Sequence, residues 1–502
     1  MSAHSYTRRD FLRTISAGAA ALAVHGCGAW QLTSHSPGKK PNFVFILIDD
    51  LGWKDLGFMG SQYYETPNID KLADQGVIFT SAYTNGPNCA PTRACLLSGQ
   101  YTPHHGVYTV GSSKRGRAHL RKLIPIQNKT TLDSRVVTIA EALKPVGYVS
   151  ASIGKWHLGK DPQHGPVGQG FDVEFQRENK GGHFNHAGEY LTDRLTDKAI
   201  DFIERNKHNP FFLYLAHHAV HTPIQAKKEM IEKYKNKRGS NGQSVSPLGD
   251  ALRRTPQGNN PTYAAMIESV DQSVGRIMDK LDSLGLTDNT VVFFFSDNGG
   301  VVGITSMEPL RGGKGMLYEG GIRVPLIVRW PGRIKPRSIC DVPAIGIDFY
   351  PTMLEMAGAP KPSGQVLDGE SIIPLLKGQS TLKRKAIFWH FPAYLQANYG
   401  WKGIWRTTPA GAVRQGDWKL IEYFEDGTLE LYNLKDDIGE QNNLAAKMPK
   451  KTKQLHGLLK DWRKSINATV PTELNPKYNP DAENKKRKRA RKTTEGMLYG
   501  PT

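Results

Sequence analysis

Short continuous runs of apolar residues alternate along the chain with segments whose apolar residues have helical spacing. Strands buried on both faces produce such runs, and the candidate strands are residues 42–48, 77–83, 148–153, 211–216, 291–295 and 324–330. Helical spacing is found in residues 66–76, 137–143, 263–284 and 348–356. This alternation predicts an α/β fold with a large mixed, mainly parallel sheet flanked by helices.

The pattern changes after about Lys385, where shorter strands and a final helix are predicted. Residues 412–421 and 429–432 are typical of short antiparallel strands, and residues 447–466 are typical of a helix. One face of that helix carries the apolar residues Leu455, Leu458, Leu459 and Trp462. We therefore expect the helix to pack its apolar face on a small sheet formed by these strands.

These patterns predict two domains and two irregular segments. The larger α/β domain covers residues 42–385, and the smaller α+β domain, with its short antiparallel sheet, covers residues 386–468. Residues 235–261 are rich in Gly, Asn, Ser and Pro, which predicts a long loop. Residues 469–502 are rich in proline and charge, which predicts a disordered tail.

The composition is that of a soluble globular protein with an excess of positive charge. Of 502 residues, 38% are hydrophobic and 23% are charged, and no apolar run is long enough for a membrane-spanning helix. The formal net charge is +19, and residues 485–492 contain seven basic residues. That run predicts either a solvated tail or an anchor for polyanionic glycans or nucleic acid. Because basic residues are also in excess elsewhere, we expect an anionic substrate. We expect no nucleic-acid partner.

The first 27 residues resemble an export signal. The pair Arg8-Arg9 stands before the apolar stretch 15–24, which is typical of a twin-arginine signal; an amphipathic surface helix is the alternative. The residues before Cys27 resemble a lipobox, although His25 departs from its usual pattern, so lipidation and simple cleavage both stay open. We expect the twin-arginine translocase as a partner, a linker over residues 28–41, and a periplasmic enzyme or one anchored at the cell envelope through lipidated Cys27.

Cysteine is sparse, and the whole chain contains Cys27, Cys89, Cys95 and Cys340. In an oxidising compartment Cys95 and Cys340 could form one disulfide. Two buried free thiols are the alternative, since free cysteine packs well in protein cores.

Polar residues stand near the ends of two candidate strands. Asp49 and Asp50 follow the run 42–48, while Asp297 and Asn298 follow the run at 291–295. Ligands bind outside the carboxyl ends of parallel strands, so the two pairs can converge. Carboxylate and amide oxygens are hard ligands that suit Ca²⁺ or Mg²⁺, although an Asp pair alone is often a turn or a helix cap.

The segment Cys89-Ala90-Pro91-Thr92-Arg93, followed by Leu96-Leu97-Ser98-Gly99, resembles the signature of the sulfatase family. In that family a maturation enzyme oxidises the cysteine to formylglycine. Further blocks match the family in order, at residues 42–52, 154–159, 219–223, 296–299 and 312–325. The resemblance extends over residues 42–462 and implies an alkaline-phosphatase-like fold. Gln100 departs from the extended signature, which could weaken recognition by the maturation enzyme, but Cys89, Pro91 and Arg93 carry its core and we expect conversion.

The resemblance also implies a role for each matching residue. One Ca²⁺ would be held by Asp49, Asp50, Asp297, Asn298 and the modified residue 89. A hydroxyl of the hydrated residue 89 would attack sulfur, His221 would protonate the leaving oxygen, and His157 would remove the proton whose loss expels sulfate. The sulfate oxygens would be held by Lys155 and Lys314, and Arg93 would support residue 89. Such positive charge, a strong nucleophile and an acid are what cleavage of an anionic ester needs.

Two neighbouring features add to this site. Residues 94–98 predict a short helix after residue 89, and its N-terminal amides would favour an anion. His183 and His186 lie in a glycine-rich loop, where we expect contacts with the substrate.

We therefore expect a sulfatase that removes sulfate from a sulfated carbohydrate. One alternative is a phosphoester or phosphonate hydrolase of the same superfamily. Retention of two lysines and two histidines around one metal site favours sulfate, because phosphatases of that superfamily usually hold two zinc ions. The other alternative is a surface protein that binds polyanions without turnover, and it would predict damage to the catalytic blocks, which are intact.

Overall fold

The computed structural model describes residues 39–177, 181–239, 259–397 and 404–483, all within one compact unit. The predicted export signal, most of the linker and the basic run 485–492 lie outside the described residues. Among the helices that the structure describes, none combines the length and apolar character needed to cross a membrane.

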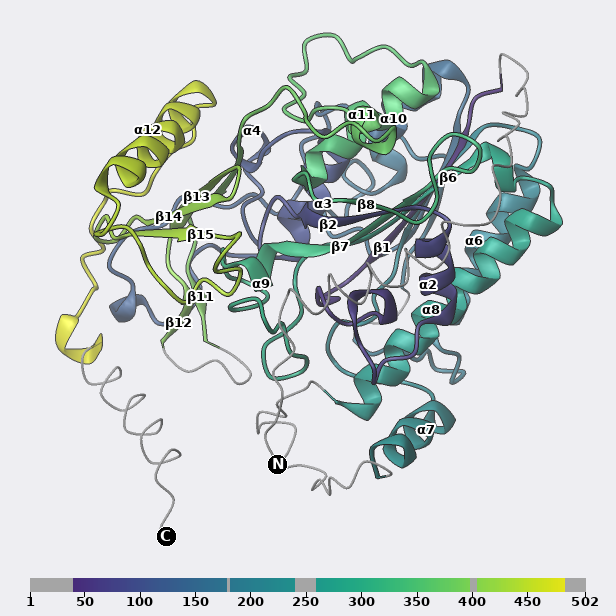
Figure 1. The fold of residues 1–502 in the computed structure, drawn as a ribbon, viewed down its shortest axis with the longest axis horizontal. Coiled ribbons are helices and arrows are strands. Elements are labelled where there is room, and N and C mark those ends of the chain that lie inside the picture. Colours follow the sequence, from purple (N-terminus) through teal and green to yellow (C-terminus); the bar gives the residue numbers. More distant parts are fainter. Residues whose placement is uncertain (1–38, 178–180, 240–258, 398–403, 484–502) are drawn as a thin grey trace, which may run out of the picture. The chain divides into compact units, whose positions relative to one another are not determined.

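A mixed sheet of nine strands forms the centre of this unit (Figure 1). Its strands are β1 (Asn42–Ile48), β2 (Val77–Tyr83), β3 (Val149–Gly154), β4 (Val173–Phe175), β5 (Phe211–Ala216), β6 (Thr290–Ser296), β7 (Arg323–Arg329), β8 (Ser338–Cys340) and β9 (Ala344–Ile345). The order is β4-β3-β5-β1-β6-β7-β2-β8, with β9 paired to β2. Because β7 alone in this order runs antiparallel to its neighbours β6 and β2, the sheet is mainly parallel, as predicted. All six strands predicted from apolar runs are present.

Helices cover both faces of the sheet because successive side chains of a strand point to opposite sides. Phe43, Phe45 and Leu47 of β1 join one buried cluster, while Val44, Ile46 and Ile48 join the other. The first cluster includes residues of α3 (Cys89–Ser98), α5 (Ile139–Leu143), α10 (Phe349–Ala357) and α11 (Ile373–Leu376). The second includes residues of α2 (Pro67–Asp74), α6 (Leu191–Arg205), α7 (Lys228–Gly239) and α8 (Pro261–Ser283). The short helices α4 (Thr102–His105) and α9 (Glu319–Ile322) follow α3 and precede β7.

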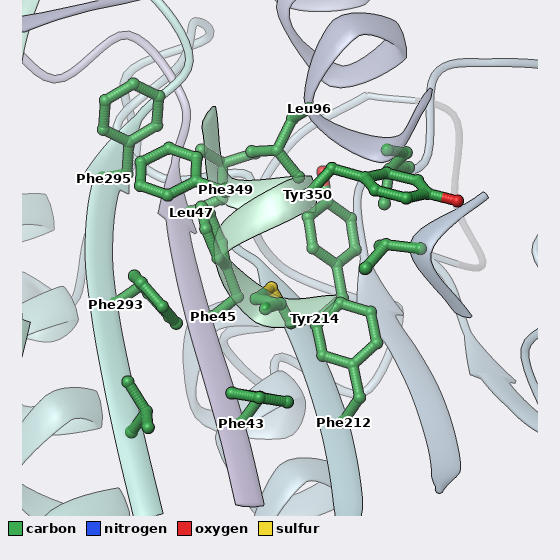
Figure 2. Close-up of a cluster of buried hydrophobic side chains, with 14 of the residues drawn as sticks. Phe43, Phe45, Leu47, Leu96, Phe212, Tyr214, Phe293, Phe295, Phe349 and Tyr350 are labelled. Carbon is green, nitrogen blue, oxygen red and sulfur yellow. The ribbon is translucent and has the colours of Figure 1, made fainter. Parts of the chain in front are cut away.

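Aromatic side chains hold β1 between its neighbours and α10. Figure 2 shows Phe45 between the aromatic residues of β5, β6 and α10. The Phe45 ring centroid lies 5.5 Å from that of Phe293 and 5.0 Å from that of Phe349. Large rings packed in stacked and edge-on contacts contribute strongly to core stability. The middle of the sheet is therefore a rigid support for the residues that follow β1 and β6.

The C-terminal part is a small α+β domain, as predicted. A four-stranded antiparallel sheet has the order β10-β13-β14-β15, with β10 (Ile387–Phe391), β13 (Ala410–Gln415), β14 (Trp418–Tyr423) and β15 (Leu429–Asn433). A second sheet pairs β11 (Leu395–Gln396) with β12 (Trp405–Thr407). The helix α12 (Pro449–Ser465) buries Leu455 and Leu459 against the larger sheet, and Trp462 stacks on Phe388 with ring centroids 4.6 Å apart.

Buried ion pairs join the small domain to the large one. Lys419 on β14 is fully buried, and its Nζ lies 2.9 Å from a carboxylate oxygen of Glu319 and 2.9 Å from one of Glu440. Glu319 begins α9, and its other oxygen accepts hydrogen bonds from Tyr83 and Arg323. Since a buried charge is retained only when it is paired, this cluster ties β14 to α9 and to the end of β2.

Two predictions about irregular segments are corrected by the structure, and one open alternative for the cysteines is decided. The predicted loop 235–261 begins as helix, because α7 continues to Gly239, and there Lys237 donates hydrogen bonds to Tyr63 and Glu65. The predicted disorder from residue 469 is wrong for residues 469–483, where Asn475 donates hydrogen bonds of 2.8 Å to the carbonyl oxygens of Ala118 and Arg121. Cys95 and Cys340 are buried free thiols, so the disulfide alternative is wrong.

Candidate active site

Two pairs of oxygen-bearing side chains, Asp49-Asp50 and Asp297-Asn298, meet at the carboxyl ends of β1 and β6, as predicted. These strands are parallel neighbours, and Ile48 at the end of β1 lies opposite Ser296 at the end of β6. The Asp50 backbone N–H donates to Asp297 Oδ1 over 3.2 Å, and Asn298 Nδ2 donates to Asp50 Oδ1 over 2.8 Å. All these side chains are buried, so the strand ends form one compact group of oxygen ligands.

Cys89 is the first residue of α3 and faces the acidic pairs. Its Sγ lies 3.2 Å from Asp49 Oδ1 and 3.3 Å from Lys314 Nζ, and the side chain is buried. The helix therefore begins at Cys89, earlier than the predicted start at residue 94. Pro91 is tolerated there because the first turn of a helix has no intrahelical partners for its N–H groups. The unpaired amides of this turn favour an anionic group that binds beside residue 89.

Arg93 lies one helical turn after Cys89 and joins three segments of the site. Its Nη2 lies 2.6 Å from Asp297 Oδ2, and its Nη1 donates to the Lys155 carbonyl oxygen over 2.6 Å. The guanidinium is fully buried, so the carboxylate beside it is needed to keep the charge paired. Arg93 thus holds α3 against the ends of β6 and β3.

Lys155 and His157 follow β3 and approach the same centre. Lys155 Nζ contacts Asp49 Oδ2 at very short range. Burial favours the neutral form of Asp49, but the positive charges of Lys155, His221 and Arg93 together hold its pKa well below the usual range. Burial, with the charges of Lys155 and Arg93, lowers the pKa of His157 to about 2. His157 is therefore neutral near pH 7.

His221 and Lys314 complete the group. His221 Nε2 lies 3.7 Å from Asp50 Oδ2, and Lys314 Nζ lies 2.5 Å from Asp50 Oδ1. Lys314 is carried by a glycine-rich loop whose Gly313 packs so closely on Gly300 that a Cβ would lie 2.7 Å from the Gly300 carbonyl oxygen. Because a side chain would not fit there, the residue before Lys314 is a glycine. Burial opposes the charge of Lys314, yet Asp50 and the other acids raise its pKa above the usual range.

The two loop histidines differ in their burial. His183 is only 2% exposed, and its Nε2 lies 2.9 Å from the His221 carbonyl oxygen. In this structure His183 therefore supports the backbone of His221, and its contact with a substrate stays a prediction. His186 is exposed on the same loop and is not among the residues that line the central pocket.

The oxygen ligands fit a hard cation such as Ca²⁺. Asp50 Oδ2 and Asn298 Oδ1 are buried acceptors without a hydrogen-bond partner among the described residues. Ligand atoms of Asp49, Asp50, Cys89 and His221 all lie within 4.8 Å of one another. Orphaned buried acceptors are rare in proteins, and carboxylate and amide oxygens are the ligands that Ca²⁺ prefers.

An unmodified Cys89 is poorly suited to act as a thiolate. Burial, with the negative charges of Asp297 and Asp49, raises the pKa of its thiol far above the usual range. Because the thiolate is the reactive form of cysteine, the thiol would stay protonated and inert near neutral pH.

A pocket of about 220 Å³ opens above these residues. Its lining comprises Asp50, Asn88, Cys89, Val110, Arg115, His157, His221, Thr222, Val301, Lys314 and Arg406. Sequence reasoning did not single out Arg115 or Arg406, because neither belongs to a recognisable block and Arg406 comes from the C-terminal domain. They add two cations to a pocket that already contains Lys314.

Cys89 lies at a helix N-terminus, between acids and lysines at the carboxyl edge of a mixed sheet. This arrangement is typical of an ester hydrolase with the alkaline-phosphatase-like fold. The family described as Sulfatase matches residues 41–359 of this chain, and N-sulphoglucosamine sulphohydrolase, C-terminal, matches residues 313–465. The chain therefore belongs to the sulfatase family and is a sulfate ester hydrolase.

Several known proteins are similar to this chain over most of its length. A sulfatase of Formosa agariphila is 36% identical over 83% of this chain and 86% of its own. The human N-acetylgalactosamine-6-sulfatase is 32% identical over 74% of each chain. The crystal structure of Ps i-CgsB in complex with k-i-k-neocarrahexaose has a TM-score of 0.70 and 28% identity, and covers 90% of this chain and 98% of that one.

Proposed function

We propose that this sulfatase removes sulfate from a sulfated carbohydrate, using a formylglycine made from Cys89 and one bound Ca²⁺. The observation that carries the proposal is the setting of Cys89 at the start of α3, where its Sγ lies 3.2 Å from Asp49 Oδ1 and 3.3 Å from Lys314 Nζ. Similarity to N-acetylgalactosamine-6-sulfatases and to Ps i-CgsB with its bound oligosaccharide supports a carbohydrate substrate.

The ligands proposed for Ca²⁺ are Asp49, Asp50, Asp297, Asn298 and the modified residue 89. When bound, the ion supplies positive charge that orients residue 89 and lowers the pKa of its hydroxyl. Lys155 and Lys314 remain charged beside Asp49 and Asp50, so they can bind sulfate oxygens as point charges. Through its buried ion pair with Asp297, Arg93 fixes the position of that ligand relative to residue 89 on the same helix as the arginine.

Two histidines carry out the two proton transfers of the proposed reaction, one as donor and one as acceptor. His221 lines the pocket on the side of Asp50 Oδ2 and would donate a proton to the leaving oxygen of the sugar. His157 also lines the pocket and is neutral because burial and neighbouring cations lower its pKa to about 2. A ring nitrogen of His157 would accept the proton that leaves residue 89 when sulfate is released. The two histidines thus have opposite tasks in one turnover.

The test is release of free sulfate and free phosphate, measured side by side. The protein would be co-expressed with a formylglycine-generating enzyme, supplied with Ca²⁺, and given sulfated oligosaccharides, an aryl sulfate and an aryl phosphate. We expect sulfate from one class of sulfated oligosaccharide. Phosphate release alone would instead support the phosphoester hydrolase. Release from neither ester type, with residue 89 converted, would contradict the proposal.

Replacement of His221 by asparagine is expected to lower kcat for a sulfated sugar by roughly 10²- to 10⁴-fold, the usual contribution of a general acid. The loss should be smaller for an aryl sulfate, because a phenolate leaves without protonation more readily than an alkoxide does. Steady-state sulfate release from both substrates measures this difference. His186→Asn, on the exposed part of the neighbouring loop, is the matched control. Equal losses on both substrates would show that His221 is not the acid.

We further propose that the chain is exported by the twin-arginine translocase and resides in the periplasm or, through lipidated Cys27, at the cell envelope. The sequence of the first 27 residues supports this proposal. Fractionation of cells that express the full chain, with and without Arg8→Lys and Arg9→Lys, tests it. Unchanged export of the double variant would contradict it.

A further inference from the structure

Arg115 and Arg406 bring two positive charges to the pocket from separate parts of the chain. Arg115 belongs to the loop that follows α4, and Arg406 belongs to β12 of the C-terminal domain. Both line the same pocket as Cys89, His221 and Lys314. The fold therefore places a pair of cations beside the catalytic group but outside the blocks that define it.

Backbone contacts hold the loop of Arg115 in place. Arg115 Nη2 donates to the Val110 carbonyl oxygen, and Arg121 Nη1 donates to the carbonyl oxygens of Lys114 over 2.9 Å and Gly116 over 2.7 Å. Gly116 has φ +77°, and a Cβ there would lie 2.5 Å from the ring of Trp405. The loop consequently packs directly on β12, next to Arg406.

Arg406 is also fixed by carbonyl oxygens. Its Nε donates to the Gln396 carbonyl oxygen over 3.1 Å, and its Nη1 donates to the Lys314 carbonyl oxygen over 3.3 Å. The latter contact couples Arg406 to the loop that carries Lys314. A guanidinium held in this way is preorganised, so little side-chain entropy is lost when it binds a ligand.

Neither arginine has an acidic partner within the described ranges, where Arg93, Lys155 and Lys314 all form ion pairs with acids of the site. Burial and the charge of Arg115 lower the pKa of Arg406 to about 10, which leaves it charged near neutral pH. Two partly buried cations that face one pocket are costly unless an anion approaches them. Their charge is thus available for a ligand.

We propose that Arg115 and Arg406 form a second anion-binding subsite, which binds a negatively charged group of the substrate other than the sulfate that is cleaved. The group is a sulfate ester or a carboxylate on the same or the adjoining sugar, since the planar guanidinium matches either oxyanion. This inference rests on the proposed function and narrows the substrate to a sulfated carbohydrate with at least two anionic groups.

The cleaved sulfate has its own cations. Lys314 Nζ lies 3.3 Å from Cys89 Sγ, whereas Arg406 contacts the backbone of Lys314 and Arg115 contacts the backbone of Val110. We therefore assign the ammonium group of Lys314 to the reacting position, and the guanidinium groups, which are anchored on other segments of the lining, to the adjoining part of the pocket. The two sets should make separable contributions to turnover.

The test compares kcat/KM for matched oligosaccharides that differ only in the second anionic group. One carries a second sulfate, one a carboxylate, and one neither. The parent enzyme should have the highest kcat/KM for one of the two dianionic substrates. That substrate shows whether the subsite binds a sulfate or a carboxylate. Arg115→Gln and Arg406→Gln should each lower that preference by about 10- to 100-fold, as expected for loss of a charge-assisted hydrogen bond. Arg406→Lys should restore part of it.

Arg117→Gln is the matched control, because Arg117 is exposed on the same loop and does not line the pocket. It should retain both the preference and the basal activity. Thermal denaturation of each variant checks folding. The subsite would be overturned if the parent enzyme did not prefer a dianionic substrate. It would also be overturned if the variants lost kcat/KM equally for the dianionic substrate and for the one without a second anionic group. Neither result would contradict the sulfatase activity. A converted enzyme that releases sulfate from no substrate would instead contradict the proposed function.

Discussion

Sulfate release by the Cys89→Ala variant is expected to fall by roughly 10⁴-fold or more, the scale found when a catalytic nucleophile is removed. Residue 89 is buried at the start of α3 between the acids and Lys314. No other cysteine lines this pocket among the described residues, so no other thiol there can replace it. Loss of one small side chain should leave the fold intact, and thermal denaturation can confirm this.

Cys89→Ser separates the proposed formylglycine from a simple oxygen nucleophile. A serine in this position could at most become sulfated once, because its sulfate ester lacks the second hydroxyl needed for internal collapse. We therefore expect at most one equivalent of desulfated sugar per enzyme, with the sulfate retained as an ester on residue 89 and no free sulfate released. The peptide mass of the parent protein reports whether Cys89 has been converted. Cys340→Ala, at a buried free thiol away from the pocket, is the control.

Two outcomes would contradict this assignment. Sustained turnover by Cys89→Ala would place the nucleophile elsewhere. Full activity of a protein whose residue 89 is still cysteine would show that the thiol serves directly, in spite of its raised pKa.

Removal of Ca²⁺ by a chelator is expected to lower kcat by on the order of 10³-fold, since a metal ion contributes several kcal/mol to stabilisation of developing charge. Activity should return when Ca²⁺ is added. A second readout is thermal denaturation, because a ligand that binds the folded state raises its stability. The orphaned acceptors Asp50 Oδ2 and Asn298 Oδ1 are the physical basis of this expectation.

Asp50→Asn should weaken the effect of Ca²⁺ on kcat and its effect on thermal denaturation. The substitution removes the charge of one ligand but hardly changes the shape of the side chain. Asp201→Asn, on the exposed surface of α6, is the matched control and should behave as the parent protein. A midpoint of thermal denaturation that does not respond to Ca²⁺ in the parent protein would contradict the metal site. A response that survives in Asp50→Asn at unchanged Ca²⁺ concentration would remove Asp50 from the ligands.

Much of the site could be predicted from local patterns. Asp49 and Asp297 follow apolar runs that become parallel neighbours, so their convergence follows from the rule for strand ends. Cys89 and Arg93 share one helical turn, a spacing that needs no knowledge of distant contacts. The assignment of Lys155, His157, His221 and Lys314 depended on family resemblance, because a single lysine or histidine carries little information by itself.

Other features depend on contacts between distant parts of the chain. The order of residues 469–483 results from hydrogen bonds to the segment around Ala118, which composition cannot indicate. His183 is buried beneath His221 because of its contact with that backbone. In each case the local sequence is polar, and a partner distant in sequence satisfies its hydrogen bonds.

The sequence by itself determined the α/β class, six of the nine strands of the large sheet and the positions of the blocks Cys89–Arg93, Asp49-Asp50 and Asp297-Asn298, because apolar periodicity and short motifs are local properties. Tertiary structure alone decided which charges share the pocket. Arg115 and Arg406 come from a loop of the large domain and a strand of the small one, and they meet because the two pack together. Coulombic interactions depend on distance in space, which separation along the chain does not specify.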